Sequence, residues 1–209
     1  MTYPTTPPKF GSQDVGSRDV ASELAGAVAE YQHSASVPQL HERLAAIAAS
    51  APPEALVDAV EPFRQIPEVA GPIYETIVAA RPDDARALVI LANAYWLAGR
   101  GPEAVGELAS RAIAADPANR GAWHLWALSE SDPRARTARW QQVVTRFHDD
   151  DLARANLADN AASLAGAEHD YDALDLAITT YEELWARSPN AQQREALEKA
   201  LTALRGWKL

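Results

Sequence analysis

Residues 84–117 read DARALVILANAYWLAGRGPEAVGELASRAIAADP and carry the clearest structural pattern in the chain. Apolar residues recur there at steps of three and four, the spacing of one face of an α-helix. Gly99 and Gly101 bracket a turn in the middle of the segment. Pro102 follows, and proline suits the first turn of a helix because its missing N–H needs no partner there. The segment therefore predicts two helices joined by a short turn.

Composition extends this prediction to the rest of the chain. Alanine accounts for 44 of the 209 residues, aromatic residues are few, and β-branched residues dominate no window. Alanine is the best helix former because it loses no side-chain entropy in a helix. We therefore expect an all-α protein. The chain has no cysteine, which excludes disulfides, thiolate nucleophiles and thiolate zinc sites.

The charge balance bears on the class of partner. The chain has 19 Lys and Arg against 29 Asp and Glu, a formal net charge of −10. This acidic excess argues against nucleic acid, whose phosphates require a basic surface. The N-terminal residues lack the basic and apolar regions of a signal peptide, and no run of about 18 apolar residues occurs. We therefore expect a cytoplasmic protein without a membrane-spanning segment.

The chain also contains an internal repeat. Four segments, IYETIVAARPDD, LASRAIAADPAN, WQQVVTRFHDDD and YEELWARSPNAQ, each place apolar residues at helical spacing before a turn. The turns contain Pro82, Pro117, His148 and Pro189, which are 35, 31 and 41 residues apart. A recurring period of about 34 residues is typical of stacked helical hairpins.

The segment 84–117 resembles a tetratricopeptide repeat (TPR). Its first half matches the first-helix pattern of that family at Leu88, Leu91, Ala92 and Tyr95. Its second half matches at Ala104, Leu108, Ala112 and Pro117, with one extra residue near Ala109. Three other segments are weaker copies, so the resemblance covers about residues 54–190. It implies a right-handed α-solenoid of antiparallel helical hairpins.

The domain organisation follows from these patterns. We expect a disordered tail over 1–17, a divergent helical pair over 18–53, a TPR-like domain over 54–205 and a C-terminal tail over 206–209. The repeat domain is expected to end in a capping helix over 190–205, because one face there is apolar and the other is polar.

The resemblance also implies a binding surface. First-helix residues of TPR proteins line a concave groove, and the matching positions here are Arg86, Val89, Asn93, Trp96, His124, Leu128 and Asp159. Trp96 follows the core position Tyr95 and should point away from the core. The leading hypothesis is therefore an adaptor that holds a peptide or helix of a partner protein, whose identity the sequence does not give. Val89 and Leu125 replace a lysine and an asparagine of the chaperone-tail binders in this family, which argues against that ligand.

Other clusters have simpler interpretations. The basic residues Arg134, Arg136, Arg139 and Arg146 form either a solvated helix face or a contact for an acidic partner. The acidic runs 148–151 and 168–172 precede predicted helices, where carboxylates cap free N–H groups, and we favour this over a divalent-cation site. The tryptophans Trp123, Trp126, Trp140 and Trp185 are expected to pack in the core.

No catalytic constellation is present in the sequence. The nucleophile motifs GxSxG and SxxK and the P-loop are all missing, and the histidines lack zinc-ligand spacing. We therefore expect no enzyme activity, no cofactor and no metal site. Two alternatives to the adaptor remain open: a structural subunit of a homo- or hetero-oligomeric assembly, and a small-ligand sensor or enzyme with a pocket between helices.

Overall fold

The computed structural model describes residues 13–207, and this range folds into helices joined by short turns. It contains eleven α-helices and one short 3-10 helix, with no strand. The all-α prediction is therefore confirmed. The first helix begins at Gln13, inside the stretch 1–17 that the sequence assigns to a tail. Residues 1–12 lie outside the described range, so the predicted disorder there stays a prediction.

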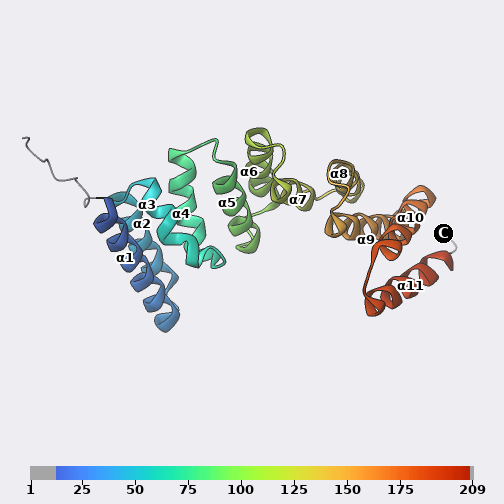
Figure 1. Cartoon of the computed structure of the whole chain (residues 1–209), viewed down its shortest axis with the longest axis horizontal. Helices are drawn as coiled ribbons and strands as arrows, with labels where there is room; N and C mark the ends of the chain where they lie inside the picture. The colour runs from blue at the N-terminus through green and yellow to red at the C-terminus, as the bar shows by residue number, and fades with distance from the viewer. Residues whose placement is uncertain (1–12, 208–209) are drawn as a thin grey trace, which may run out of the picture. The chain divides into compact units, whose positions relative to one another are not determined.

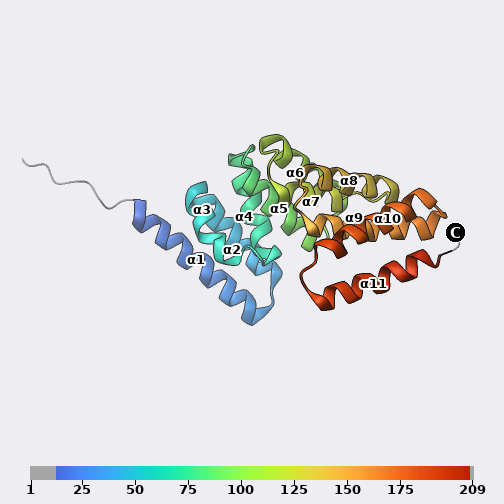
Figure 2. The same cartoon turned by 45° about the vertical axis from the view of Figure 1, so that its right-hand side comes forward.

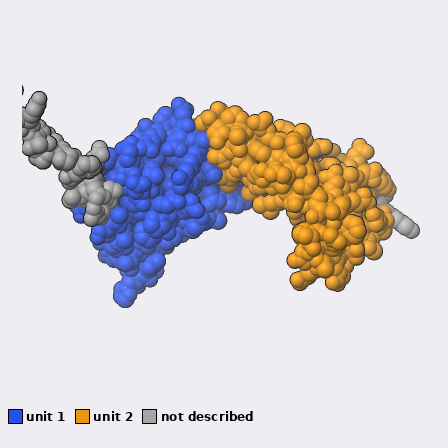
Figure 3. Space-filling view, in the orientation of Figure 1, with its two compact units in different colours: residues 1–100 blue, residues 101–209 orange. Residues whose placement is uncertain are grey.

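The chain divides into two compact units, residues 1–100 and 101–209 (Figure 3). The division falls between Arg100 and Gly101, within the turn that the sequence predicts at the centre of its clearest repeat. The predicted boundary at residue 53 stays a prediction, since it separates helical pairs inside the first unit.

The first unit is built from consecutive helices that pack side by side. In chain order they are α1 (Gln13–Ser34), α2 (Val37–Ser50), α3 (Pro53–Val60), η1 (Glu61–Phe63), α4 (Pro67–Ala80) and α5 (Ala85–Leu97). Helix α1 packs against α2 and α3, and α4 packs against α2, α3 and α5 (Figure 1). The apolar faces predicted from periodicity are buried, including Leu24, Val28, Leu40, Leu44 and Ile47.

The second unit continues the same pattern, with each helix packed on the next (Figure 2). Its helices are α6 (Pro102–Ala115), α7 (Arg120–Leu128), α8 (Pro133–Arg146), α9 (Asp151–Glu168), α10 (Tyr171–Arg187) and α11 (Ala191–Arg205). Of the described helices, none is long and apolar enough to cross a membrane.

Short polar side chains start most of these helices. Asp150 accepts a hydrogen bond from the Ala153 N–H at 3.0 Å and begins α9, and Asp170 does the same for α10 through Ala173 at 3.0 Å. These contacts confirm the capping interpretation of both acidic runs. Gly99 and Gly101 have φ values of +67° and +93°, a conformation that glycine adopts without strain.

The tryptophans divide between core and surface. Trp140 is fully buried and packs with Ala127, Val143, Ala153 and Leu157, as the sequence predicts. The core prediction is wrong for Trp185, whose side chain is 38% exposed. Its indole N–H donates to Glu198 of α11 at 3.1 Å, so a polar contact with the last helix takes the place of apolar packing.

Candidate functional site

Helix α5 carries the first four residues of the predicted groove. Arg86, Val89, Asn93 and Trp96 follow one another at steps of three, four and three, so they share one face of the helix. Val89 and Asn93 are half-buried, while the Trp96 side chain is 42% exposed. Arg86 is exposed and pairs with Glu61 at 3.1 Å.

Local packing explains why Trp96 faces outward. The opposite face of α5 places Ala87, Leu88, Leu91, Ala92 and Ala94 in the core of the first unit. The end of the helix is also anchored, because the Tyr95 hydroxyl donates to Glu75 at 2.8 Å. Burial and this hydrogen bond both raise the pKa of Tyr95. The next residue, Leu97, is 54% exposed, so the end of α5 has two exposed large apolar side chains.

The predicted groove residues of the second unit lie in a different environment. The His124 Nε2 atom is 2.7 Å from an Asp150 oxygen, and the imidazole meets the Trp140 ring edge-on at a centroid distance of 5.3 Å. Leu128 packs against the buried cluster around Trp140. Asp159 is exposed but accepts a hydrogen bond from the Tyr181 hydroxyl. All three side chains are thus engaged within the unit, unlike Trp96.

Asp150 is the centre of a charged cluster between α7 and α9. Besides His124, Arg120 approaches it at 3.7 Å and pairs with Asp149 at 3.0 Å. Burial favours the neutral acid at Asp150, but the Ala153 N–H, His124 and Arg120 outweigh it and lower the pKa of the carboxyl. The cluster ties the start of α9 to α7, and its carboxylates serve as caps and ion-pair partners.

The four arginines predicted as a contact for an acidic partner all have partners inside the second unit. Arg134 pairs with Glu168 at 2.6 Å and Asp170 at 2.7 Å, and Arg136 donates to Asn160 at 2.7 Å. Arg146 donates to the carbonyl of Pro117 at 3.2 Å. Arg139 bonds to the carbonyl of Trp126 at 2.7 Å. These contacts connect α8 to its neighbours within the second unit.

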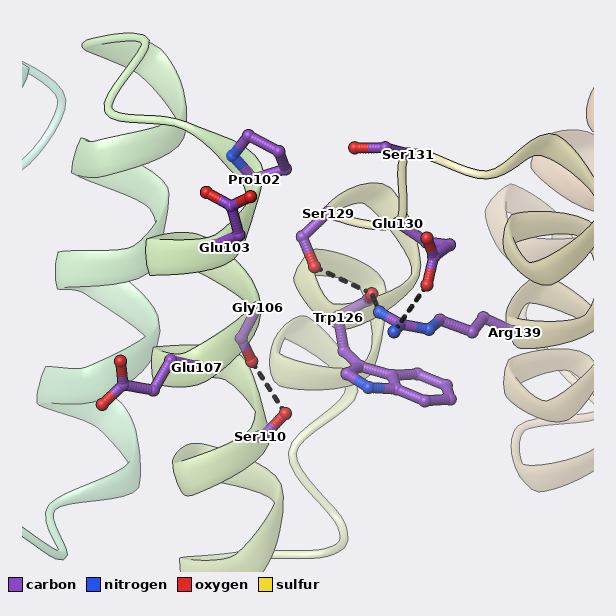
Figure 4. Close-up of a pocket in the computed structure, with 10 residues that line it drawn as sticks. All are labelled: Pro102, Glu103, Gly106, Glu107, Ser110, Trp126, Ser129, Glu130, Ser131 and Arg139. Carbon is purple, nitrogen blue, oxygen red and sulfur yellow. Dashed lines mark hydrogen bonds and ion pairs between the residues drawn. The ribbon is translucent and has the colours of Figure 1, made fainter.

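A cleft of about 410 Å³ opens between α6, the end of α7 and α8 (Figure 4). The cleft is lined by Pro102, Glu103, Gly106, Glu107, Ser110, Trp126, Ser129, Glu130, Ser131 and Arg139. The half-buried indole of Trp126 lies between α6 and α8, beneath the Arg139 guanidinium in this view. All of these residues belong to the second unit.

Helices α6 and α7 approach each other closely at the base of this cleft. A Cβ atom on Gly106 would come within 2.9 Å of the Ser129 hydroxyl oxygen, so a larger residue would require a shift. The Ser129 hydroxyl donates to the Trp126 carbonyl at 3.0 Å. Both Gly106 and Ser129 line the cleft.

Solved structures share this succession of helical hairpins. TTC0263, a thermophilic TPR protein of Thermus thermophilus, is 17% identical with a TM-score of 0.53, and the match covers 88% of this chain and 99% of that chain. A crystal structure of MamA is 13% identical with a TM-score of 0.53, covering 83% of this chain and 95% of that one. The chain has the tetratricopeptide-repeat fold. No family model and no curated protein sequence matches the chain. At these identities the likeness establishes the fold alone.

The sequence predicts the helices of this fold better than it predicts the environment of individual side chains. The sequence predicts that His124 and Leu128 line a groove, whereas in the structure both side chains contact other residues of the second unit. The sequence does not predict the cleft at Trp126, because its pattern assigns Trp126 to the core. Gly106, a residue of low helix propensity within α6, is the sequence signal that could have indicated it.

No metal site is formed by the described residues. No group of three or more histidine, aspartate or glutamate side chains within residues 13–207 is arranged to hold an ion. The acidic runs that suggested one are occupied by helix caps and ion pairs, as Asp149, Asp150 and Asp170 show.

Proposed function

We propose that this protein is an interaction module that holds a peptide or helix of a partner protein against α5, with Trp96 as the main apolar contact. TPR folds typically serve in protein interactions, which supports the general assignment. The observation that carries the specific proposal is the exposure of two large apolar side chains, Trp96 and Leu97, at the end of α5. Tryptophan is enriched among the residues that dominate binding energies.

The rest of the α5 face suits such a segment. Val89 adds apolar contact, and Asn93 offers an amide that can hydrogen-bond to peptide backbone. Arg86 adds a positive charge. Its ion pair with Glu61 is exposed and therefore weak, so a ligand can compete for it. This mixture of apolar and polar groups at helical spacing fits an extended or helical ligand.

The test is capture of partners from native lysate followed by mass spectrometry, with wild type and two variants. Trp96→Ala should lose the proteins that wild type retains, because it removes the central apolar contact. Trp185→Ala is the matched control, since its indole is similarly exposed at 38% but lies on α10. Equal retention of the same proteins by wild type and Trp96→Ala would show that α5 is not the binding surface.

A further inference from the structure

The cleft between α6 and α8 contains a cation–π contact between Arg139 and Trp126. The Arg139 guanidinium lies 4.5 Å from the centroid of the Trp126 ring, a distance typical of a cation–π contact. Glu130 pairs with this guanidinium at 2.7 Å, and the Trp126 carbonyl accepts a hydrogen bond from it at 2.7 Å. The charge of Arg139 is therefore compensated within the cleft itself.

The opposite wall carries two carboxylates with no such compensation. Glu103 and Glu107 extend from α6, four residues apart, where like charges destabilise each other. Among the described residues, neither side chain forms an ion pair or hydrogen bond, and Figure 4 draws no contact from either to the other lining residues. The partial positive charge at the N-terminus of α6 stabilises the Glu103 carboxylate. Glu107 lies beyond the first turn and does not receive this stabilisation. With Glu130 balancing Arg139, the lining is left with two negative charges.

We propose that this cleft binds a lysine or arginine side chain from a basic segment of another protein. Its volume of about 410 Å³ accommodates a long side chain, and its open side lets the rest of the segment remain outside. Glu103 and Glu107 supply negative charge for the incoming cation, and the indole of Trp126, one face of which lies under the Arg139 guanidinium, supplies apolar surface. The exposed Ser131 offers a hydroxyl to the backbone of the segment, and the Ser110 hydroxyl, which donates to the Gly106 carbonyl at 2.7 Å, can still accept from it. This site uses α6 to α8 and does not depend on the proposed role of α5.

The test uses two synthetic hexapeptides, one of alternating arginine and serine and one in which citrulline replaces every arginine. Citrulline keeps the shape of arginine but has no charge. The titration follows the indole N–H resonance of Trp126 by NMR, identified by its loss in Trp126→Phe. The arginine peptide should shift this resonance, and the citrulline peptide should not. Replacement of both carboxylates, Glu103→Gln with Glu107→Gln, should weaken binding about three- to tenfold.

A matched control separates a specific site from general acidity. The pair Glu23→Gln with Glu42→Gln removes the same charge from exposed positions in the first unit. It should leave the affinity for the arginine peptide unchanged, and both double variants should melt as wild type does. The proposal is overturned if the Trp126 resonance does not respond, or if the control pair weakens binding as much as the cleft pair. Neither outcome would bear on Trp96 and the proposed function.

Discussion

At the scale of single residues, two tryptophans in opposite environments should differ in how much they contribute to stability. Trp140 is fully buried, whereas Trp96 is 42% exposed. Trp140→Ala should lower the free energy of unfolding by about 3–5 kcal/mol, because it leaves a cavity in the core. Trp96→Ala should change it by about 0.5 kcal/mol or less. Urea denaturation of both variants measures the difference. A large loss for Trp96→Ala would mean that its indole belongs to the core.

Asp150 makes a second residue-scale prediction, which concerns pH. Its pKa is lowered from the ordinary value of 3.8, so the ionised carboxylate stabilises the folded state above pH 3.8. This contribution is lost as the pH falls below 3.8 and through the lower folded pKa. Asp150→Asn keeps an oxygen for the Ala153 N–H but loses the charge. We expect it to be about 1–2 kcal/mol less stable at pH 7 and to lose less stability on acidification than wild type.

The measurement is urea denaturation from pH 7 down to about pH 2, which extends below the unfolded pKa of Asp150. Asp175→Asn, at an exposed position on α10, is the control and should follow the wild-type pH dependence. If Asp150→Asn and wild type lose stability in parallel on acidification, the charge of Asp150 does not contribute in the way that its contacts with His124 and Arg120 indicate.

At the scale of elements, the sequence predicts helices well because their signals are local. Proline and aspartate mark the starts of α6, α8 and α10, and the buried faces of α1 and α2 follow the 3.6-residue period. Side-chain environments depend instead on which helix lies opposite. His124 faces Asp150 and Trp185 faces Glu198, and both partners belong to other helices or their caps, far along the sequence. Periodicity carries no information on such contacts, so the environment of His124 and the cleft at Trp126 could not be predicted from it.

The last helix offers an element-scale prediction. The polar face of α11 is exposed, while Leu201 and Leu204 are buried, and Leu204 joins the cluster of Ala161, Leu164 and Leu174. Ending the chain at Pro189 should therefore cost about 3 kcal/mol or more, since each buried leucine contributes about 1.5–3 kcal/mol. Lys199→Ala, which removes only an exposed ion pair with Glu195, should cost less than about 0.5 kcal/mol. Urea denaturation and binding of an apolar dye detect the exposed surface. A truncated chain as stable as wild type would show that α11 is not a cap.

At the scale of the whole molecule, the division at residue 100 predicts that the second unit folds by itself. Residues 101–209 contain the buried clusters around Trp140 and Leu164, and each helix there packs on the next one in sequence. In repeat folds stability is close to a sum of local terms, so a fragment that keeps its own core should remain folded. The fragment 101–209 should show a helical circular dichroism spectrum and a cooperative thermal transition. The same fragment with Trp140→Ala should lose that transition or shift it to a much lower temperature. A wild-type fragment that is unfolded at low temperature would show that its helices require contacts from residues 1–100.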